Sequence, residues 1–428
     1  MNVLIIGSGG REHAFVWKLK QSPKCGEVFI APGNGGTNTL ATNLTIDVSD
    51  IDVVKEAILS NDVRLVVIGP EVPLVNGLVD DLKAQPELKD LLIVGPAKSG
   101  AILEGSKEVS KEFMNKYGVP TAAAKVFDAS NIEEGYAFLE SLKPPYVLKA
   151  DGLAAGKGVL ITEDIEEAKK NLDDLIIHKQ FGDASAKVLI EEFLTGIEVS
   201  VFVLTDGKDY VILPEAKDYK RIGEGDTGLN TGGMGAISPV IFADRAFMES
   251  VEEEVVKPTV EGIKAEGMDY CGFIFIGLMN SGGKPKVIEY NVRMGDPETE
   301  VVLPRIKSDM LDLLVTAASG KLGSFDLEIE PYTAATLVLV AGGYPEAYEK
   351  GKEITIEGEI KTVIPFHAGT KEENGKLVTN GGRVMTLTGL GKNLPEALSN
   401  CYTAAERIKW DGINYRRDIG KDLQKLGQ

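Results

Sequence analysis

Short runs of consecutive apolar residues alternate with amphipathic segments along the N-terminal part of the chain. Runs of this kind predict strands of a parallel sheet covered on both faces, because such strands are buried along their whole length. They lie at Val3–Ile6, Val28–Ala31, Leu65–Ile68 and Leu91–Val94. Helical periodicity follows at Glu12–Lys20, Asp52–Leu59 and Leu78–Lys83. The alternation predicts a doubly wound α/β domain.

The pattern then changes toward strands and longer helices. A helix is expected at Lys107–Tyr117, where Gly118 and Pro120 supply the stop. From Ala124 to Phe193 the order is strand, helix, strand, glycine-rich loop, strand, helix, strand. Strands then dominate, with one long helix at Arg245–Glu266, and those strands are Glu198–Leu204, Tyr210–Leu213, Gly272–Met279 and Lys286–Asn291.

The C-terminal part forms a further small unit. We expect strands near Thr336–Val340 and Val384–Leu390 and a helix at Pro395–Lys409, and we interpret Pro214–Ala236 as a long irregular loop. The resulting division is 1–103, a connecting helix at 104–123, two central subdomains at 124–193 and 194–324, and a C-terminal domain at 325–428.

Composition narrows the class of protein. The net charge of −19 argues against binding a nucleic-acid backbone, which requires clustered lysine and arginine. Cys25, Cys271 and Cys401 follow no metal-ligand spacing and are expected to be free thiols. The first apolar run is too short for a signal peptide, and no run reaches membrane-spanning length. We expect a cytoplasmic protein without nucleic-acid or membrane partners.

Three glycine-containing loops leave strand ends on one edge of the predicted parallel sheet. Gly7–Glu12 opens a helix, where backbone N–H groups and the positive dipole end favour an anion. A dinucleotide fingerprint would need glycine at Glu12, and the second strand lacks a ribose-binding acid. Pro32–Thr37 and Gly69–Glu71 follow the next strands. A phosphate or small-molecule site and a set of structural turns are both open interpretations.

The segment Lys149–Gly158 points more strongly to a nucleotide. Small residues allow backbone N–H groups to surround a polyphosphate, and Lys149 and Lys157 supply positive charge. The alternative is an exposed hairpin with two solvated lysines. Further along, Glu191, Glu192 and Glu198 are acids at a strand end that could accept bonds from ribose or remain solvated.

A third feature is the strand Val287–Arg293. Alternation places Glu289, Asn291 and Arg293 on one face. Carboxylate and amide oxygens suit Mg²⁺ shared with phosphates, and a guanidinium can stabilise a transferring phosphoryl group. A salt-bridged strand face is the alternative. Asp296 and Pro297 resemble the N-cap and first residue of a helix that points at this site.

Together these motifs resemble the phosphoribosylamine–glycine ligase family, which has the ATP-grasp fold. The resemblance runs nearly end to end. It rests on Gly7–His13, Lys149–Gly158, Asp226–Gly228, Asn230–Gly235, Asn291–Glu298, Phe366–Thr370, Thr379–Arg383 and Tyr415–Gly420. It implies a multi-domain α/β ATP-grasp fold with a doubly wound parallel-sheet N-terminal domain and a small C-terminal α/β domain.

The resemblance also implies the reaction. ATP phosphorylates glycine, and 5-phosphoribosylamine attacks the glycyl phosphate to give glycinamide ribonucleotide, ADP and phosphate in purine biosynthesis. Mg²⁺ or Mn²⁺ is implied at Glu289 and Asn291, with catalytic groups Asp218, Arg293 and Asp296. ATP contacts are implied at Lys107, Lys149, Gly156, Lys157, Glu191, Glu192, Leu194, Glu198 and Lys217. Substrate contacts are implied at Gly9, Gly10, Arg11, Glu12, Asn34, Glu71 and Gly295. A monomer or weak dimer is expected.

One departure from the superfamily concerns the metal. Many ATP-grasp enzymes carry a second acidic ligand on the preceding strand, but Gly272–Met279 contains no acid. These residues support one metal ion and leave a second ion open. Two rival interpretations stay open: an ATP-grasp ligase for another acid and amine, which should lack the Asn230–Ala236 loop, and a dinucleotide-binding dehydrogenase or sensory module.

Overall fold

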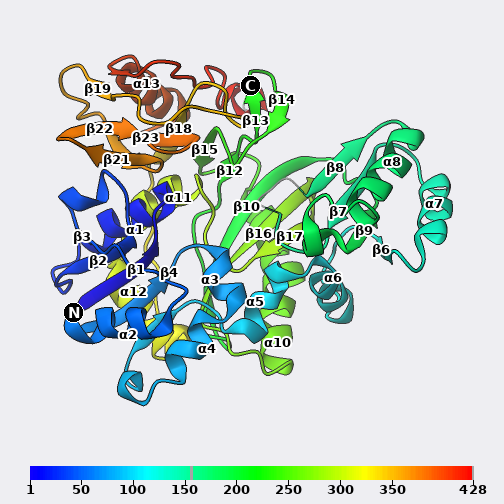
Figure 1. Ribbon diagram of the computed structural model, residues 1–428, viewed down its shortest axis with the longest axis horizontal. Coiled ribbons are helices and arrows are strands. Elements are labelled where there is room, and N and C mark those ends of the chain that lie inside the picture. Colours follow the sequence, from blue (N-terminus) through cyan, green and yellow to red (C-terminus); the bar gives the residue numbers. More distant parts are fainter. Residues whose placement is uncertain (155–157, 427–428) are drawn as a thin grey trace.

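The computed structural model describes residues 1–154 and 158–426, arranged around one parallel and three larger antiparallel sheets (Figure 1). The parallel sheet has the order β3-β2-β1-β4-β5. Its strands are β1 (Asn2–Gly7), β2 (Val28–Pro32), β3 (Thr42–Asn43), β4 (Val63–Ile68) and β5 (Leu92–Val94). Around it lie α1 (Gly10–Leu19), η1 (Thr37–Thr39), α2 (Ile51–Ser60), α3 (Glu71–Asn76), α4 (Leu78–Lys83), η2 (Pro86–Leu88) and α5 (Lys98–Gly105). The predicted doubly wound domain is confirmed.

The carboxyl ends of the central strands lie side by side, as parallel pairing requires. The Gly33 N–H donates to the Gly7 carbonyl (3.1 Å), and the Gly69 N–H donates to the Ile6 carbonyl (3.0 Å). The loops after β1, β2 and β4 therefore meet at one edge of the sheet, where ligands of open α/β sheets bind.

Helix α6 (Lys107–Lys116) leads to a small antiparallel sheet with the order β6-β9-β7-β8. Its elements are β6 (Ala124–Asp128), α7 (Ile132–Ser141), β7 (Tyr146–Ala150), β8 (Val159–Thr162), α8 (Ile165–Ile176), η3 (Gly182–Ser185) and β9 (Lys187–Glu191). Leu139, Leu148 and Leu172 belong to its separate core. This unit projects from the rest of the molecule with α7 and α8 outermost (Figure 1). The predicted order of elements is confirmed.

A second antiparallel sheet, β11-β10-β16-β17, forms the centre of the molecule. Its strands are β10 (Ile197–Thr205), β11 (Tyr210–Ile212), β16 (Gly272–Ser281) and β17 (Lys284–Asn291). The predicted long helix runs through α9 (Arg245–Val251), the π-helical η4 (Glu252–Val256) and α10 (Lys257–Ala265). Helices α11 (Thr299–Arg305), α12 (Met310–Ala318) and η5 (Leu322–Ser324) connect this sheet to the C-terminal domain.

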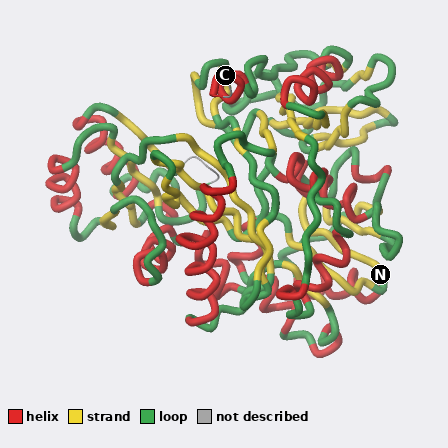
Figure 2. Tube along the Cα trace, turned by 180° about the vertical axis from the view of Figure 1, so that it is seen from behind, coloured by secondary structure: helices red, strands yellow, loops and turns green. Residues whose placement is uncertain are grey.

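The third antiparallel sheet, β12-β15-β18-β23-β20, combines strands from two distant parts of the chain. Strands β12 (Lys217–Asp218) and β15 (Gly235–Ser238) come from the middle, whereas β18 (Thr333–Val340), β20 (Val363–His367) and β23 (Arg383–Gly391) are C-terminal. Short pairs are β13 (Arg221–Gly223) with β14 (Thr227–Asn230), β21 (Thr370–Glu373) with β22 (Lys376–Thr379), and β19 (Thr355–Ile356) with β24 (Ile408–Lys409). Helices α13 (Leu394–Ala405) and α14 (Lys421–Leu426) complete it, and the reverse view shows α13 against this sheet (Figure 2).

Three local expectations are wrong. Pro214–Ala236 is not an irregular loop, because parts of it pair as β12, β13, β14 and β15. The helix expected at Pro395–Lys409 ends at Ala405, because Ile408 and Lys409 pair with β19. Asp296 is not an N-cap: α11 starts at Thr299 after Glu298. The Asp296 carboxylate is instead engaged by Arg11 and Arg383.

No helix among the described residues is long and apolar enough to cross a bilayer.

Candidate active site

Strand β17 delivers the predicted metal-binding pair to the centre of the molecule. Glu289 pairs opposite Gly277 and Asn291 opposite Phe275, so the two side chains share a face two residues apart. Among the described residues no lysine or arginine lies within 4.0 Å of the Glu289 carboxylate. Although burial opposes ionisation, the charges of Lys149, then Lys220 and Lys107, hold the pKa of Glu289 below its usual value. The site is therefore an ionised carboxylate surrounded by cations.

Arg293 follows β17 and is fixed by two acids from the N-terminal domain. Its Nη2 donates to Glu104 (2.8 Å) and to the Asn291 Oδ1 (3.2 Å), while its Nε donates to Glu71 (3.2 Å). Glu104 also accepts the Val292 N–H at 2.8 Å. Sequence reasoning identified Glu71 and missed Glu104, because nothing in the helical pattern of α5 distinguishes it from a surface acid.

Two lysines that the sequence predicts to contact phosphate, Lys149 and Lys107, lie on two different elements. Lys149, the fourth residue of β7, is only 5% exposed, and its Nζ pairs with Glu191 at 2.7 Å. The same carboxylate pairs with Lys111 at 3.0 Å, a residue that sequence reasoning missed. Lys107 begins α6, and its Nζ donates to the Gly152 carbonyl at 3.1 Å. The Glu191 carboxylate therefore positions lysines, and Lys107 ties α6 to the loop after β7.

Asp218 of β12 and Glu298, the residue before α11, are close enough for the charge of one to affect the other. Burial raises the pKa of Asp218. Burial, and then the negative charge of Asp218, raise the pKa of Glu298 to about 7. Glu198 on β10 pairs with Lys220 at 2.6 Å, and the charges of Asp218 and Glu198 raise the pKa of Lys220, although partial desolvation of this half-exposed side chain opposes the rise. Glu298 lies within a motif that the sequence singled out, yet no role was predicted for it.

Asp296, which follows the central sheet, contacts both the N-terminal domain through Arg11 and the C-terminal domain through Arg383. Its Oδ2 accepts the backbone N–H of Arg11 at 3.2 Å, and its Oδ1 pairs with Arg383 Nη1 at 3.1 Å. Although burial favours the protonated form, the charges of Arg383 and Arg11 hold the pKa of Asp296 below its ordinary value. Arg383 also donates to the Gly232 carbonyl at 2.9 Å, so it binds the Asn230–Gly235 segment.

In the loop after β1, carboxylates of the protein itself accept the backbone N–H groups that could otherwise bind an anion. The Gly9 N–H donates to Glu12 Oε2 at 2.7 Å, and the Arg11 side chain donates to Glu12 and to the Met294 carbonyl (3.1 Å). The Gly9 and Arg11 N–H groups that the sequence offered to an anion are thus engaged by Glu12 and Asp296. The loop still borders a cavity of about 630 Å³ whose cationic lining comes from Lys371 and Arg383.

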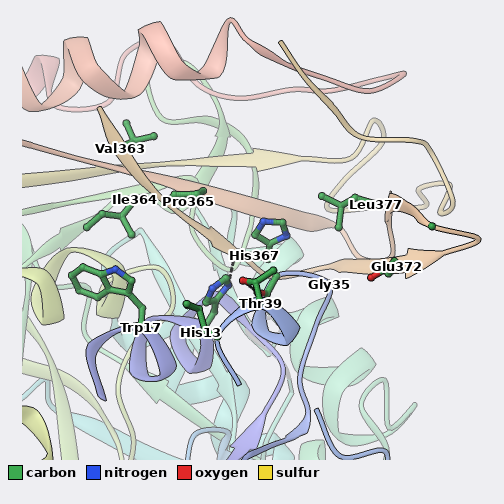
Figure 3. Close-up of a pocket in the computed structure, with 13 residues that line it drawn as sticks. His13, Trp17, Gly35, Thr39, Val363, Ile364, Pro365, His367, Glu372 and Leu377 are labelled. Carbon is green, nitrogen blue, oxygen red and sulfur yellow. Dashed lines mark hydrogen bonds between the residues drawn. The ribbon is translucent and has the colours of Figure 1, made fainter. Parts of the chain in front are cut away.

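A second cavity, of about 600 Å³, lies on the other side of the Pro32–Thr37 loop (Figure 3). At its floor the Nδ1 of His13 accepts the backbone N–H of His367 at 2.8 Å. The Asn34 Nδ2 donates to the His367 carbonyl at 2.7 Å. Both backbone groups of His367 are therefore bound by side chains of the N-terminal domain. Burial lowers the pKa of His13 to about 3 and that of His367 to about 4, so both rings are neutral.

The remaining predicted residues are distributed as follows. Glu192 pairs with Lys286 at 3.2 Å beside the β9–β10 connection, which also contains Leu194. Gly295 leaves no room for a side chain, because an added Cβ would overlap the Glu298 carboxylate. Gly10 packs against the carboxylate of Glu300. Gly156 and Lys157 lie outside the described residues.

Comparison with known proteins matches almost the whole chain. Family models for phosphoribosylglycinamide synthetase match as the N domain at residues 1–104, the ATP-grasp (A) domain at 105–299 and the C domain at 334–422.

Individual relatives agree with the family models. A phosphoribosylamine–glycine ligase of Chlorobaculum tepidum is 46% identical over 98% of this chain and 99% of its own length. One of Pasteurella multocida is 44% identical over 98% and 97%. The crystal structure of phosphoribosylamine–glycine ligase from Thermotoga maritima superposes with a TM-score of 0.85 at 39% identity, covering 98% of this chain and 100% of that chain.

Proposed function

Since the chain belongs to the phosphoribosylglycinamide synthetase family, we propose that the cluster around β17 is the centre at which it acts. The enzyme is an ATP-dependent ligase that joins glycine to 5-phosphoribosylamine and gives glycinamide ribonucleotide, ADP and phosphate in purine biosynthesis. One observation carries the assignment of the site: the partly buried Glu289 carboxylate lies among the charges of Lys107, Lys149 and Lys220, which come from α6, β7 and the turn between β12 and β13.

The nucleotide lies between the small sheet and the central sheet. Lys107 and Lys149 bind its phosphates, together with Gly156 and Lys157, which lie outside the described residues. Lys217, which the sequence also offered to the phosphates, is paired instead with Asp422, whose Oδ2 lies 3.2 Å from its Nζ. The β9–β10 connection, with Glu191, Glu192 and Leu194, borders the adenine, and Glu198 accepts the ribose hydroxyls. The fixed position of Lys149 on Glu191 supports this arrangement, because a lysine whose Nζ is already held loses little freedom on binding phosphate.

The donor set at β17 fits one divalent cation. Glu289 and Asn291 offer hard oxygens, which Mg²⁺ or Mn²⁺ prefers. The Asn291 Oδ1 accepts one N–H from Arg293 at 3.2 Å and keeps a second lone pair for an ion. Those residues contain no group of three or more His, Cys, Asp or Glu side chains that could hold a metal ion. Phosphate oxygens and water would complete the coordination. The bound ion would neutralise phosphate charge.

The acceptor substrate occupies the 630 Å³ cavity at the edge of the parallel sheet. Its phosphate meets Lys371 and Arg383, because these are the cations that line the cavity, while Gly9 and Asn34 shape its wall. Arg11 and Glu12 hold the loop from behind, and Glu71 orients Arg293. Arg293, Asp218 and Asp296 then meet glycine and the nascent product next to Gly295.

The reaction needs positioning and charge neutralisation but no protein nucleophile. A glycine carboxylate oxygen attacks the γ-phosphorus of ATP, and the bond to ADP breaks. The amine of phosphoribosylamine attacks the glycyl carbon, loses a proton, and the C–O bond to phosphate breaks. Arg293 is suited to stabilise the negative charge of the transferring phosphoryl group, because three side-chain acceptors fix its guanidinium.

The test is ADP formation by the purified protein with Mg²⁺. ADP and glycinamide ribonucleotide should form in equal amounts only when glycine and freshly generated phosphoribosylamine are both present. Turnover with another carboxylate and amine in their place would refute the substrate assignment. Turnover by Glu289→Gln at the wild-type rate would refute the site assignment alone.

We also propose a cellular compartment and an oligomeric state for the enzyme. The three free thiols support a cytoplasmic enzyme, because thiols stay reduced in that compartment, and we propose a monomer or weak dimer. Sedimentation at micromolar concentration tests the assembly, and a tight higher oligomer would contradict it.

A further inference from the structure

The cavity of about 600 Å³ between the N-terminal and C-terminal domains is not used by the proposed reaction. It lies between α1, the Pro32–Thr37 loop and η1 on one side and β20 with the β21–β22 hairpin on the other. Gly35 and Glu372 line both this cavity and the 630 Å³ cavity assigned to the acceptor. Small-molecule sites usually measure about 300–1,000 Å³, so the cavity is large enough for a ligand of its own.

Apolar side chains form one end of this cavity. Trp17 is held edge-on against the fully buried Phe366, with 5.7 Å between the ring centroids and an interplanar angle of 81°. Figure 3 shows Trp17 and Ile364 at one end and Leu377 and Glu372 at the other. A fixed, partly exposed indole is suited to stack against a planar ring, because its flat surface loses little freedom on binding.

Two neutral imidazoles lie between these ends. Because the His13 Nδ1 accepts the His367 N–H at 2.8 Å, the proton of this neutral ring is on Nε2, which is therefore a donor. The His367 Nδ1 contacts the Thr370 hydroxyl at 3.1 Å. Neither Nε2 has a hydrogen-bond partner in the described part of the chain, and neither is sealed from solvent. Both rings can therefore bind a polar ligand through Nε2.

The charge of the lining disfavours a phosphorylated ligand. Among the described residues that line the cavity, Glu372 is the only one with a charge, since both imidazoles are neutral. Its neighbour Lys371 pairs with Glu373 at 3.0 Å and lines the other cavity. A phosphate would meet a carboxylate without a compensating cation, whereas an N–H donor would be bound by that carboxylate.

We propose that this cavity is a second ligand site, which binds a planar amino-substituted nitrogen heterocycle without phosphate, the chemical class of the free nucleobases. The ring stacks on Trp17, and its nitrogens meet the imidazoles of His13 and His367. Its amino group donates to the Glu372 carboxylate. Binding is non-covalent and does not depend on the roles proposed for the residues around β17.

The test is calorimetric titration of adenine into the purified protein with excess MgADP, which fills the proposed nucleotide site. One equivalent should bind with a Kd below about 1 mM. Trp17→Leu should weaken binding about tenfold, because the stacking surface is lost. Thr39→Phe should weaken it at least as much, because Thr39 lines the cavity and a larger side chain would fill it. Thr403→Phe, at an exposed position of α13, is the matched control and should bind adenine like the wild type.

The ligand class is tested with AMP, which should bind at least about tenfold more weakly than adenine. Equal affinities would refute the charge argument and the ligand class with it. No binding of adenine at millimolar concentration would refute the site, and so would binding that Thr39→Phe leaves unchanged. Urea unfolding of each variant separates a folding defect from a loss of binding. A failure of MgADP to bind would contradict the proposed nucleotide site, whereas Thr39→Phe would still decide the cavity.

Discussion

The His13 contact predicts a specific loss of stability in mild acid. The His13 ring is 4% exposed, and its Nδ1 can accept the His367 N–H only while it is unprotonated. Burial, and then the nearby His367, lower the pKa of His13 from 6.5 to about 3. In the unfolded chain the imidazole regains its ordinary pKa. Below that value the unfolded state binds a proton that the folded state does not.

This difference in pKa between the folded and unfolded states fixes the sign and size of the change in unfolding free energy with pH. Stability is complete above pH 6.5, falls as the pH drops, and stops falling near pH 3, where the folded ring also protonates. The slope is about 1.36 kcal/mol per pH unit, so lowering the pH to about 5 should cost roughly 2 kcal/mol from His13 alone. Other groups titrate in the same range, so the contribution is isolated only by a variant without this imidazole.

The assay is urea unfolding at pH 7.5 and pH 5.0, followed by tryptophan fluorescence, because Trp17 lies one turn beyond His13 on α1. His13→Gln removes the titration and retains an acceptor. The free energy of unfolding should fall by about 2 kcal/mol less in His13→Gln than in the wild type between these pH values. His178→Gln, at the exposed third histidine, should follow the wild type. Equal pH dependence of His13→Gln and wild type would refute the argument.

Three further predictions concern the site and its framework. Glu289→Gln should lower turnover at least about 100-fold without changing the unfolding curve, because the proposed metal loses its charged ligand; near-normal kcat would contradict the metal assignment. Arg293→Lys should lower kcat roughly 10- to 100-fold, since lysine cannot reproduce the fork that binds Glu71 and its other partners; an unchanged kcat would make Arg293 structural. Gly36→Ala should destabilise the protein by about 1–3 kcal/mol in urea unfolding, because the added Cβ would overlap the His367 ring; a neutral change would show that the ring moves freely.

The local pattern of apolar and polar residues was sufficient to predict most strands and helices. The buried strands of the parallel sheet and helices α4 and α6 were predicted to within about two residues, because their apolar periodicity reflects burial on known faces. Glu289 and Asn291 were placed on one face for the same reason, since side chains alternate along a strand regardless of what lies around it. The order of elements in the small sheet required no knowledge of distant contacts.

The wrong predictions for Pro214–Ala236 and for Asp296 share one cause, which is contact between segments that are distant in the sequence. Strands β12 and β15 are too short to show a pattern of their own, and they exist because β18 supplies hydrogen bonds to β15. Asp296 has the composition of a helix cap, yet its carboxylate is taken by Arg383, far away in the sequence. A polar side chain binds whichever partner tertiary packing brings near, so its local pattern does not determine its partner.

The sequence by itself therefore determined the fold class, the shared face of Glu289 and Asn291 and, through its motifs, the family. The tertiary structure alone decided which charges meet: Glu104 with Arg293, Lys111 with Glu191, and Asp422 with Lys217. Apolar burial leaves a periodic trace in the chain because each element must present one face to the core. Ion pairs between domains leave none, because their partners are adjacent in space and far apart in sequence.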